Sequence, residues 1–230
     1  LAMHISFPGV RAPKPGKSPE EPKELEELNR WFDDAIAYGE RMDTAGSAGV
    51  ETRSLQLEAL LPYARGEKPI LIEANAPLTI MAARAWCKER GLDPIYLGAK
   101  QAWKVAGFLG ADRANVLTGS VHSLPRKDTD PFDSAYRNAK ILVAAGCVLG
   151  LRNEDTQVAR NLPFQAATAG VNGLNQDGAL HALTLGPATV LGIDRFTGSL
   201  EVGKAANLFI SAGDPFDNSG KVVRMWLGGR

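Results

Sequence analysis

Six polar residues follow short apolar runs that have the composition of buried β-strands. In chain order these residues are Glu73, Asn75, Lys100, His122, Arg152 and Asp155. An imidazole such as that of His122 holds a ligand or moves a proton near neutral pH, and a carboxyl group acts as acid or base. We therefore take Glu73, His122 and Asp155 as catalytic candidates. The polar groups of Asn75, Lys100 and Arg152 are candidates for binding a substrate.

A regular alternation of strands and helices, beginning at residue 70, positions these residues. The predicted helices end at Gly91, Gly110 and Gly146, as helices commonly do. The predicted strands cover residues 70–74, 95–98, 115–118 and 147–151, and the predicted helices cover residues 77–90, 101–109 and 131–145, the last capped by Asp130. Four such units in succession predict an α/β fold with a parallel sheet and helices outside it.

Residues 1–66 are predicted to be a largely helical segment that leads into these units, although the first seven residues could form a short strand. Residues 18–21 have the form of a capping box with proline at the first helical position. A second helix contains Pro62 and is predicted to stop at Gly66.

The end of the chain carries the most specific pattern. Its parts, in order, are ALHALTLGPA at 179–188, LGID at 191–194, GSLEVGK at 198–204 and GDP at 213–215. This series resembles the C-terminal signature of the amidohydrolase superfamily, in its imidazolonepropionase-like branch. The resemblance implies the C-terminal half of a (β/α)8 TIM barrel, with strands five to eight in residues 67–196. It also implies that residues 197–230 are C-terminal β-strands of a small composite β-sandwich domain. The aspartate usual in the family after this glycine-lysine pair is Asn207 here.

A half barrel has two open strand edges, which a protein must cover or pair. We therefore expect either that this chain is a fragment and the remainder of its own chain completes the barrel, or that a homo-oligomer does so.

The metal-ligand positions depart from the pattern that the resemblance implies. Metal-dependent relatives place histidines at the ends of strands five and six and an aspartate at the end of strand eight, where the bound ions activate water. The matching residues here are Glu73, Leu97 and Arg152. Leucine cannot ligate a metal, and arginine repels a cation. The usual binuclear site is therefore not expected and no metal ligand is assigned, which leaves room for one divalent, zinc-like ion.

Each catalytic candidate also has a plainer interpretation. Glu73 could be a partly buried carboxylate that pairs with Arg152 or Lys100. His122 could belong to a surface loop, and Asp155 to a solvated one. The side chain of Lys100 is expected to point to solvent.

Two functions follow from the resemblance. The first is a hydrolase that acts on non-peptide carbon–nitrogen bonds of a small amide or cyclic amide, with a reduced or atypical metal site. The second is a catalytically silent barrel, a pseudoenzyme that binds a small-molecule ligand or serves as a subunit.

Composition excludes some other partners. The 26 basic residues equal the 26 acidic ones, so net charge does not favour nucleic acid or an anionic membrane as a partner. The longest apolar run, residues 141–151, is too short to span a bilayer. These features favour a soluble, cytoplasmic protein. Cys87 and Cys147 are expected to be isolated buried thiols.

Overall fold

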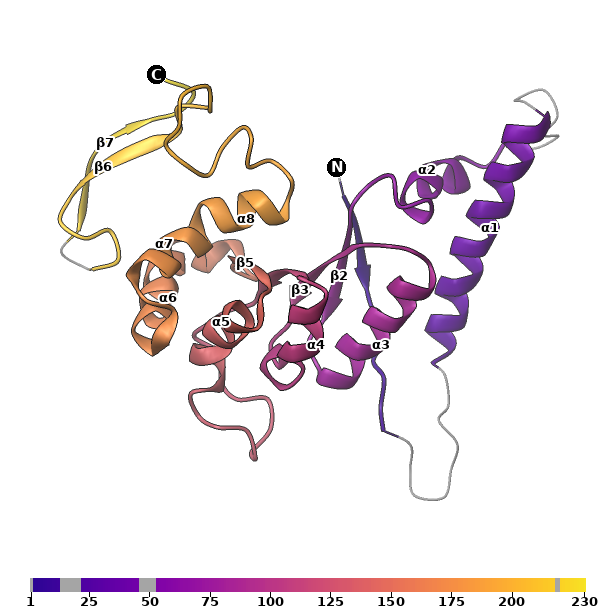
Figure 1. The fold of residues 1–230 in the computed structure, drawn as a ribbon, viewed down its shortest axis with the longest axis horizontal. Helices are drawn as coiled ribbons and strands as arrows, with labels where there is room; N and C mark the ends of the chain where they lie inside the picture. Colours follow the sequence, from indigo (N-terminus) through magenta and orange to yellow (C-terminus); the bar gives the residue numbers. More distant parts are fainter. Residues whose placement is uncertain (1, 13–21, 46–52, 218–219) are drawn as a thin grey trace. The chain divides into compact units, whose positions relative to one another are not determined.

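The computed structural model describes residues 2–12, 22–45, 53–217 and 220–230, and its main feature is a five-stranded sheet in the order β1-β2-β3-β4-β5 (Figure 1). The strands are β1 (Met3–Ser6), β2 (Ile70–Ala74), β3 (Pro94–Gly98), β4 (Asn115–Thr118) and β5 (Val148–Leu151). β1 pairs in parallel with β2, and β4 pairs in parallel with β5. The predicted α/β fold with a parallel sheet is therefore confirmed. The chain divides into two compact units, Leu1–Ile95 (unit 1) and Tyr96–Arg230 (unit 2).

Unit 1 buries one face of its strand pair. Ile70 and Ile72 on β2 are 1% and 0% exposed, and Phe7 follows β1 on the same side. The ring of Phe7 lies edge-on to Trp86, with centroids 6.0 Å apart, and Trp86 lies edge-on to Phe32 at 4.9 Å. These three aromatic rings fill much of the core of unit 1, because large rings bury more apolar area than any other side chains.

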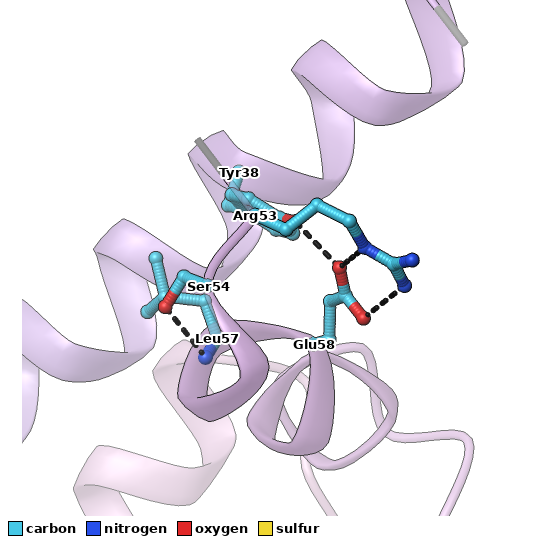
Figure 2. A network of polar contacts seen from close by, with 5 residues as sticks. All are labelled: Tyr38, Arg53, Ser54, Leu57 and Glu58. Carbon is cyan, nitrogen blue, oxygen red and sulfur yellow. Dashed lines mark hydrogen bonds and ion pairs between the residues drawn. The ribbon is translucent and has the colours of Figure 1, made fainter. Parts of the chain in front are cut away.

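The helices of unit 1 are α1 (Lys23–Ala45), α2 (Leu55–Ala64) and α3 (Pro77–Glu89). A polar network joins α1 to α2 (Figure 2). The hydroxyl of Tyr38 donates to Glu58 Oε1 at 2.8 Å, and Arg53 donates to the same carboxylate through Nε at 2.8 Å and Nη2 at 2.7 Å. Ser54 caps α2 by accepting a hydrogen bond from the N–H of Leu57 at 3.4 Å. The network therefore ties the start of α2 to the middle of α1.

The Glu58 carboxylate has a strongly altered pKa. The hydrogen bonds from Arg53 and then Tyr38 lower its pKa from 4.5 to about 2. The same contact with Glu58 raises the pKa of the Tyr38 hydroxyl. Both shifts show that this network favours the ionised carboxylate.

Unit 2 buries β4 and β5 more completely than unit 1 buries its strands. Besides most of β3 and all of β4 and β5 it contains η2 (Ala102–Lys104), α4 (Ala106–Ala111), α5 (Ser134–Ala145), η3 (Thr156–Asn161), α6 (Leu162–Ala169), the π-helical turn η4 (Gly170–Leu174), α7 (Gln176–Leu183), α8 (Leu185–Val190), β6 (Leu208–Ala212) and β7 (Lys221–Trp226). β6 and β7 form a separate antiparallel pair that is largely exposed. In β4, Val116 and its neighbour Leu117 are 0% and 8% exposed, so both faces of this strand are covered.

Several predicted boundaries agree with the structure. α5 ends at Gly146, which takes φ = 103° and so needs a residue that tolerates the left-handed region. Asn175 caps α7 by accepting a hydrogen bond from the N–H of Gly178 at 2.7 Å. Gly66, with φ = 70°, follows the end of α2 as predicted, and Pro62 lies inside that helix.

The short strand that the first seven residues could form is present as β1, which pairs with β2 and adds a fifth strand to the four of the βα units. Two other predictions about elements need correction, and one lies outside the described residues. The helix expected from residue 101 is broken, because Val105 leaves helical geometry between η2 and α4. Asp130 does not cap α5, which begins later at Ser134. The capping box at residues 18–21 lies outside the described residues.

Within the described part of the chain, no helix is both long and apolar enough to cross a membrane.

Candidate functional site

The carboxyl ends of β3, β4 and β5 carry a charged pair. Lys100 Nζ lies 2.8 Å from Glu154 Oε2, and the two side chains are 23% and 34% exposed. The pair lies over Gly119, where an added Cβ would come within 2.7 Å of Glu154 Oε1 and 3.4 Å of Lys100 Cε. A glycine after β4 therefore makes room for the pair. The expectation that Lys100 points freely to solvent is wrong, because Glu154 holds its ammonium group.

Arg152 follows β5 on the same edge. Its backbone N–H donates to Thr118 O at 3.2 Å, which continues the β4–β5 pairing by one residue. The side chain is half-buried, and the described residues offer no hydrogen-bond acceptor to its buried Nε. Arg152 is therefore a partly desolvated cation at a strand end.

A buried amide holds the ends of β3 and β4 in place. Asn138 of α5 donates through Nδ2 to Ala99 O at 3.0 Å and to Thr118 Oγ1 at 3.1 Å. Its Oδ1 accepts the N–H of Trp103 at 2.9 Å. Ala99 has φ = 48°, a strained conformation for a non-glycine residue that these hydrogen bonds help to maintain.

A second buried amide joins the loops that follow β4 and β5. Gln165 of α6 is 3% exposed. It accepts the N–H of Val121 at 3.0 Å and donates to Asn153 Oδ1 at 2.6 Å. The residue before His122 and the residue after Arg152 are therefore both held by α6, which favours a fixed arrangement of these loops.

The hydrogen bonds of His122 indicate which ring nitrogen carries the proton. His122 Nε2 lies 2.8 Å from Thr168 Oγ1, and that hydroxyl donates to Phe164 O at 3.0 Å. A hydroxyl has one proton to donate, so when Thr168 donates to Phe164 O, Nε2 is the nitrogen that donates to Thr168. In the neutral ring, Nδ1 is then left with an acceptor lone pair. His122 is exposed in the loop after β4, as expected for a residue that follows this strand.

Asp155 has a structural contact. Its Oδ1 accepts the N–H of Gln157 at 2.9 Å and caps η3. Its neighbour Glu154, rather than Asp155, is the acidic residue that meets Lys100. Both residues belong to one polar run after β5, and nothing in their spacing indicated which carboxylate would turn back over the sheet.

In unit 1, Glu73 lies beside a histidine. Its Oε2 is 3.4 Å from Nε2 of His4 on the neighbouring strand, with side chains 38% and 50% exposed. His4 and Glu73 alternate with the buried residues of β1 and β2, so they lie on the open face of this strand pair. Within unit 1 the partner of Glu73 is therefore this histidine, and a pairing of Glu73 with Lys100 or Arg152 stays a prediction. Asn75 lies in the turn from β2 to α3 and is half-buried.

Lys104, the second lysine after β3, belongs to a partly buried ion pair. Lys104 bonds Asp130, and Gln101 Nε2 donates to the same carboxylate at 2.6 Å. These contacts, with that of Lys104 the largest, hold the pKa of Asp130 below its usual range. The Asp130 side chain is 2% exposed, so this pair fixes the loop before α5 from inside the fold.

The donor atoms present do not fit a metal site. Leu97, at one expected ligand position, is a buried apolar residue, and Arg152, at another, is a cation. His4 and Glu73 provide two donor side chains, whereas protein zinc sites use three or four. The described residues contain no cluster of three or more histidine, cysteine, aspartate or glutamate side chains that could hold an ion.

The cysteines are unsuited to chemistry. Burial raises the pKa of Cys87 to about 12 and that of Cys147 to about 11. Both thiols are free and buried, as predicted, so neither is a reactive thiolate at neutral pH.

Comparisons with known proteins show the fold. No family model matches this chain, and no curated protein matches it. An amidohydrolase structure from Thermotoga maritima is similar with a TM-score of 0.79 at 23% identity, over 89% of this chain and 54% of that one. A prolidase in complex with N-methylphosphonate-L-proline has a TM-score of 0.54 at 17% identity, over 78% and 49%.

An adenosine deaminase from Xanthomonas campestris with bound zinc has a TM-score of 0.52 at 18% identity, over 76% of this chain and 47% of that one. The chain thus spans about half the length of each of these structures. The more specific predictions, of the imidazolonepropionase-like branch and of the C-terminal half, stay predictions. The chain therefore has the α/β fold of amidohydrolase structures, over about half of their length.

Proposed function

We propose that this chain is part of a hydrolase of the amidohydrolase type that cleaves a non-peptide carbon–nitrogen bond in a small amide or cyclic amide. The shared fold supports the general class. The solved structures with this fold include a deaminase and a prolidase, so a silent barrel is the less supported alternative.

One observation carries the proposal within unit 2. The carboxyl ends of three successive strands present a cation–carboxylate pair, a second cation and a histidine whose ring orientation is held by Thr168. In parallel α/β folds this end of the sheet is where ligands bind and where catalytic groups lie. The loops that bear these side chains are anchored by buried amides, which is the kind of support that a functional site requires.

The chemistry assigns a role to each group. Hydrolysis of an amide needs a base that takes a proton from water, a cation that stabilises the oxyanion, and an acid that protonates the departing nitrogen. His122 Nδ1 is proposed as the base, because the contact with Thr168 leaves its lone pair free. Lys100 is proposed to stabilise the developing oxyanion, and Asp155 remains a candidate acid.

A second candidate for the base is His4 in unit 1. Glu73 is close enough to His4 to orient its imidazole. Asn75 is proposed to bind substrate near this pair. The two histidines are alternatives, and separate variants distinguish them. No step is assigned to a metal ion, because the donor atoms of the described residues do not form a site for one.

The test is product release from a panel of small linear and cyclic amides. We expect His122→Ala to lower kcat by about a hundredfold or more, the usual contribution of a general base. Arg195→Gln, an exposed arginine stacked on Phe196 in unit 2, serves as the control and should leave the rate unchanged. An unchanged rate in His122→Ala with a large loss in His4→Ala or Glu73→Gln would move the base to unit 1. Wild-type rates no higher than the uncatalysed rate would contradict the proposed function.

A further inference from the structure

The charged side chains at the strand ends of unit 2 differ in whether they have a partner. Lys100 is paired with Glu154, so these two charges offset each other. The carboxylate of Asp155 is engaged by the backbone at the start of η3. Arg152 remains, and the described residues form no ion pair with it, whereas Arg137 of the same unit is paired with Asp133. Arg152 is therefore a cation at these strand ends that has no ion-pair partner among the described residues.

The surroundings of Arg152 increase the effect of that charge. Its Nε is buried and has no acceptor among the described residues, so part of the guanidinium has lost water without gaining a partner. An uncompensated, partly desolvated charge is unfavourable for folding. The same desolvation strengthens the attraction to an anion that approaches the half-exposed end of the side chain.

The backbone under Arg152 is fixed. Its N–H is bonded to Thr118 O, and the next residue, Asn153, is held by Gln165 and donates to Val158 O at 2.8 Å. Little backbone entropy would therefore be lost when a ligand binds the guanidinium, which favours affinity.

We propose that Arg152 binds the carboxylate of the substrate, so that the amide hydrolysed by this protein is a monoanion such as an N-acyl amino acid. A planar guanidinium matches a carboxylate with two parallel hydrogen bonds. One guanidinium without an ion-pair partner matches one carboxylate, and the nearby Glu154 disfavours a dianion such as phosphate. This inference rests on the proposed function, because it takes the bound carboxylate to be part of a substrate. The binding itself can be measured without catalysis.

The test is isothermal titration calorimetry of this chain with a matched pair of probes. N-acetylglycine carries the carboxylate, and N-acetylglycinamide replaces it with a neutral amide. Inorganic phosphate is the third probe. The proteins are the wild type, Arg152→Gln, Arg152→Lys and the control Arg195→Gln.

We expect the wild type and Arg195→Gln to bind N-acetylglycine at least about tenfold more tightly than N-acetylglycinamide. Arg152→Gln should lose this preference, and Arg152→Lys should keep only part of it, because lysine retains the charge without the planar fork. Arg152→Gln should also melt at the same temperature as the wild type or higher, since it removes an unpaired, partly buried charge.

Three results would overturn the inference. The first is equal binding of the two glycine derivatives by the wild type. The second is an unchanged preference in Arg152→Gln, and the third is phosphate binding tighter than that of N-acetylglycine. Hydrolysis of neutral amides at a rate insensitive to Arg152→Gln would remove the inference and leave the proposed function standing. Binding of the probes as expected, without hydrolysis of any amide, would contradict the proposed function and leave the inference about Arg152 standing.

Discussion

The strands β1 and β2 of unit 1 are buried on one face, whereas the strands β4 and β5 of unit 2 are buried on both. In β2 every second residue is buried, and Leu71 and Glu73 on the other face are only half-buried. In β4 three successive residues, Val116 to Thr118, are buried, which covers both faces. A titratable side chain can therefore lie within a strand in unit 1, as Glu73 does, whereas β4 and β5 of unit 2 carry none and such groups lie in the loops that follow them.

This difference decides where chemistry is available. On the open face of β1 and β2, His4 and Glu73 meet across neighbouring strands and remain accessible. In unit 2 a charge within β4 would be buried without a partner, which is costly. Lys100, His122 and Arg152 accordingly all follow strand ends.

The largest expected effect tests the burial pattern itself. In β2, Ile72→Ala should lower the free energy of unfolding by about 2–5 kcal/mol, as for other buried Ile→Ala changes, and Leu71→Ala should cost clearly less. In β4, Leu117→Ala should cost about 2–5 kcal/mol, and Val116→Ala should also be clearly destabilising. Urea denaturation of the four variants measures this. Equal costs in β2, or a cost that alternates in β4, would contradict the comparison.

The sequence predicted the alternation of β2 through α5 well, because apolar runs and terminal glycines reflect local physics. The strand β1 was harder, since its four residues gain stability only through pairing with β2, distant in the chain. The break at Val105 and the late start of α5 depend on tertiary contacts. Lys104 and Gln101 hold Asp130 inside the fold, so it cannot serve as a helix cap.

The site was predictable in position and less so in pairing. All six candidate residues lie in a strand or within four residues after its end, as expected. Which groups meet was not predictable, because the partners Lys100 and Glu154 are 54 residues apart. The same holds for His122 and Thr168, 46 residues apart. The buried amides Asn138 and Gln165 gave no signal beyond being polar residues on apolar helices.

A smaller effect concerns the α1–α2 network of unit 1, which depends on one carboxylate. Glu58 has a pKa of about 2 in the folded protein, below its ordinary 4.5, so its ionised form stabilises the fold. This contribution is fully present above pH 4.5 and is lost as the pH falls through about 2. Glu58→Gln should therefore be less stable than the wild type at pH 7, with a modest difference because the contact is partly exposed.

Urea denaturation at several pH values from neutral to strongly acidic checks this prediction. The difference between wild type and Glu58→Gln should shrink steadily as the pH falls below 4.5. A difference that stays constant down to pH 2 would mean that Glu58 acts through shape rather than charge.

The central claim concerns the candidate site residues of both units. Their side chains can recognise a charged group and transfer a proton, and the donor atoms of the described residues do not form a metal site. Zinc titration of the metal-free chain, followed by calorimetry and by metal content from plasma mass spectrometry, tests it most directly. We expect zinc to bind the wild type only weakly and in less than a one-to-one ratio, and we expect His4→Ala and Glu73→Gln to leave this binding unchanged. Tight, stoichiometric zinc that is lost in either variant would contradict it and return a metal ion to the mechanism.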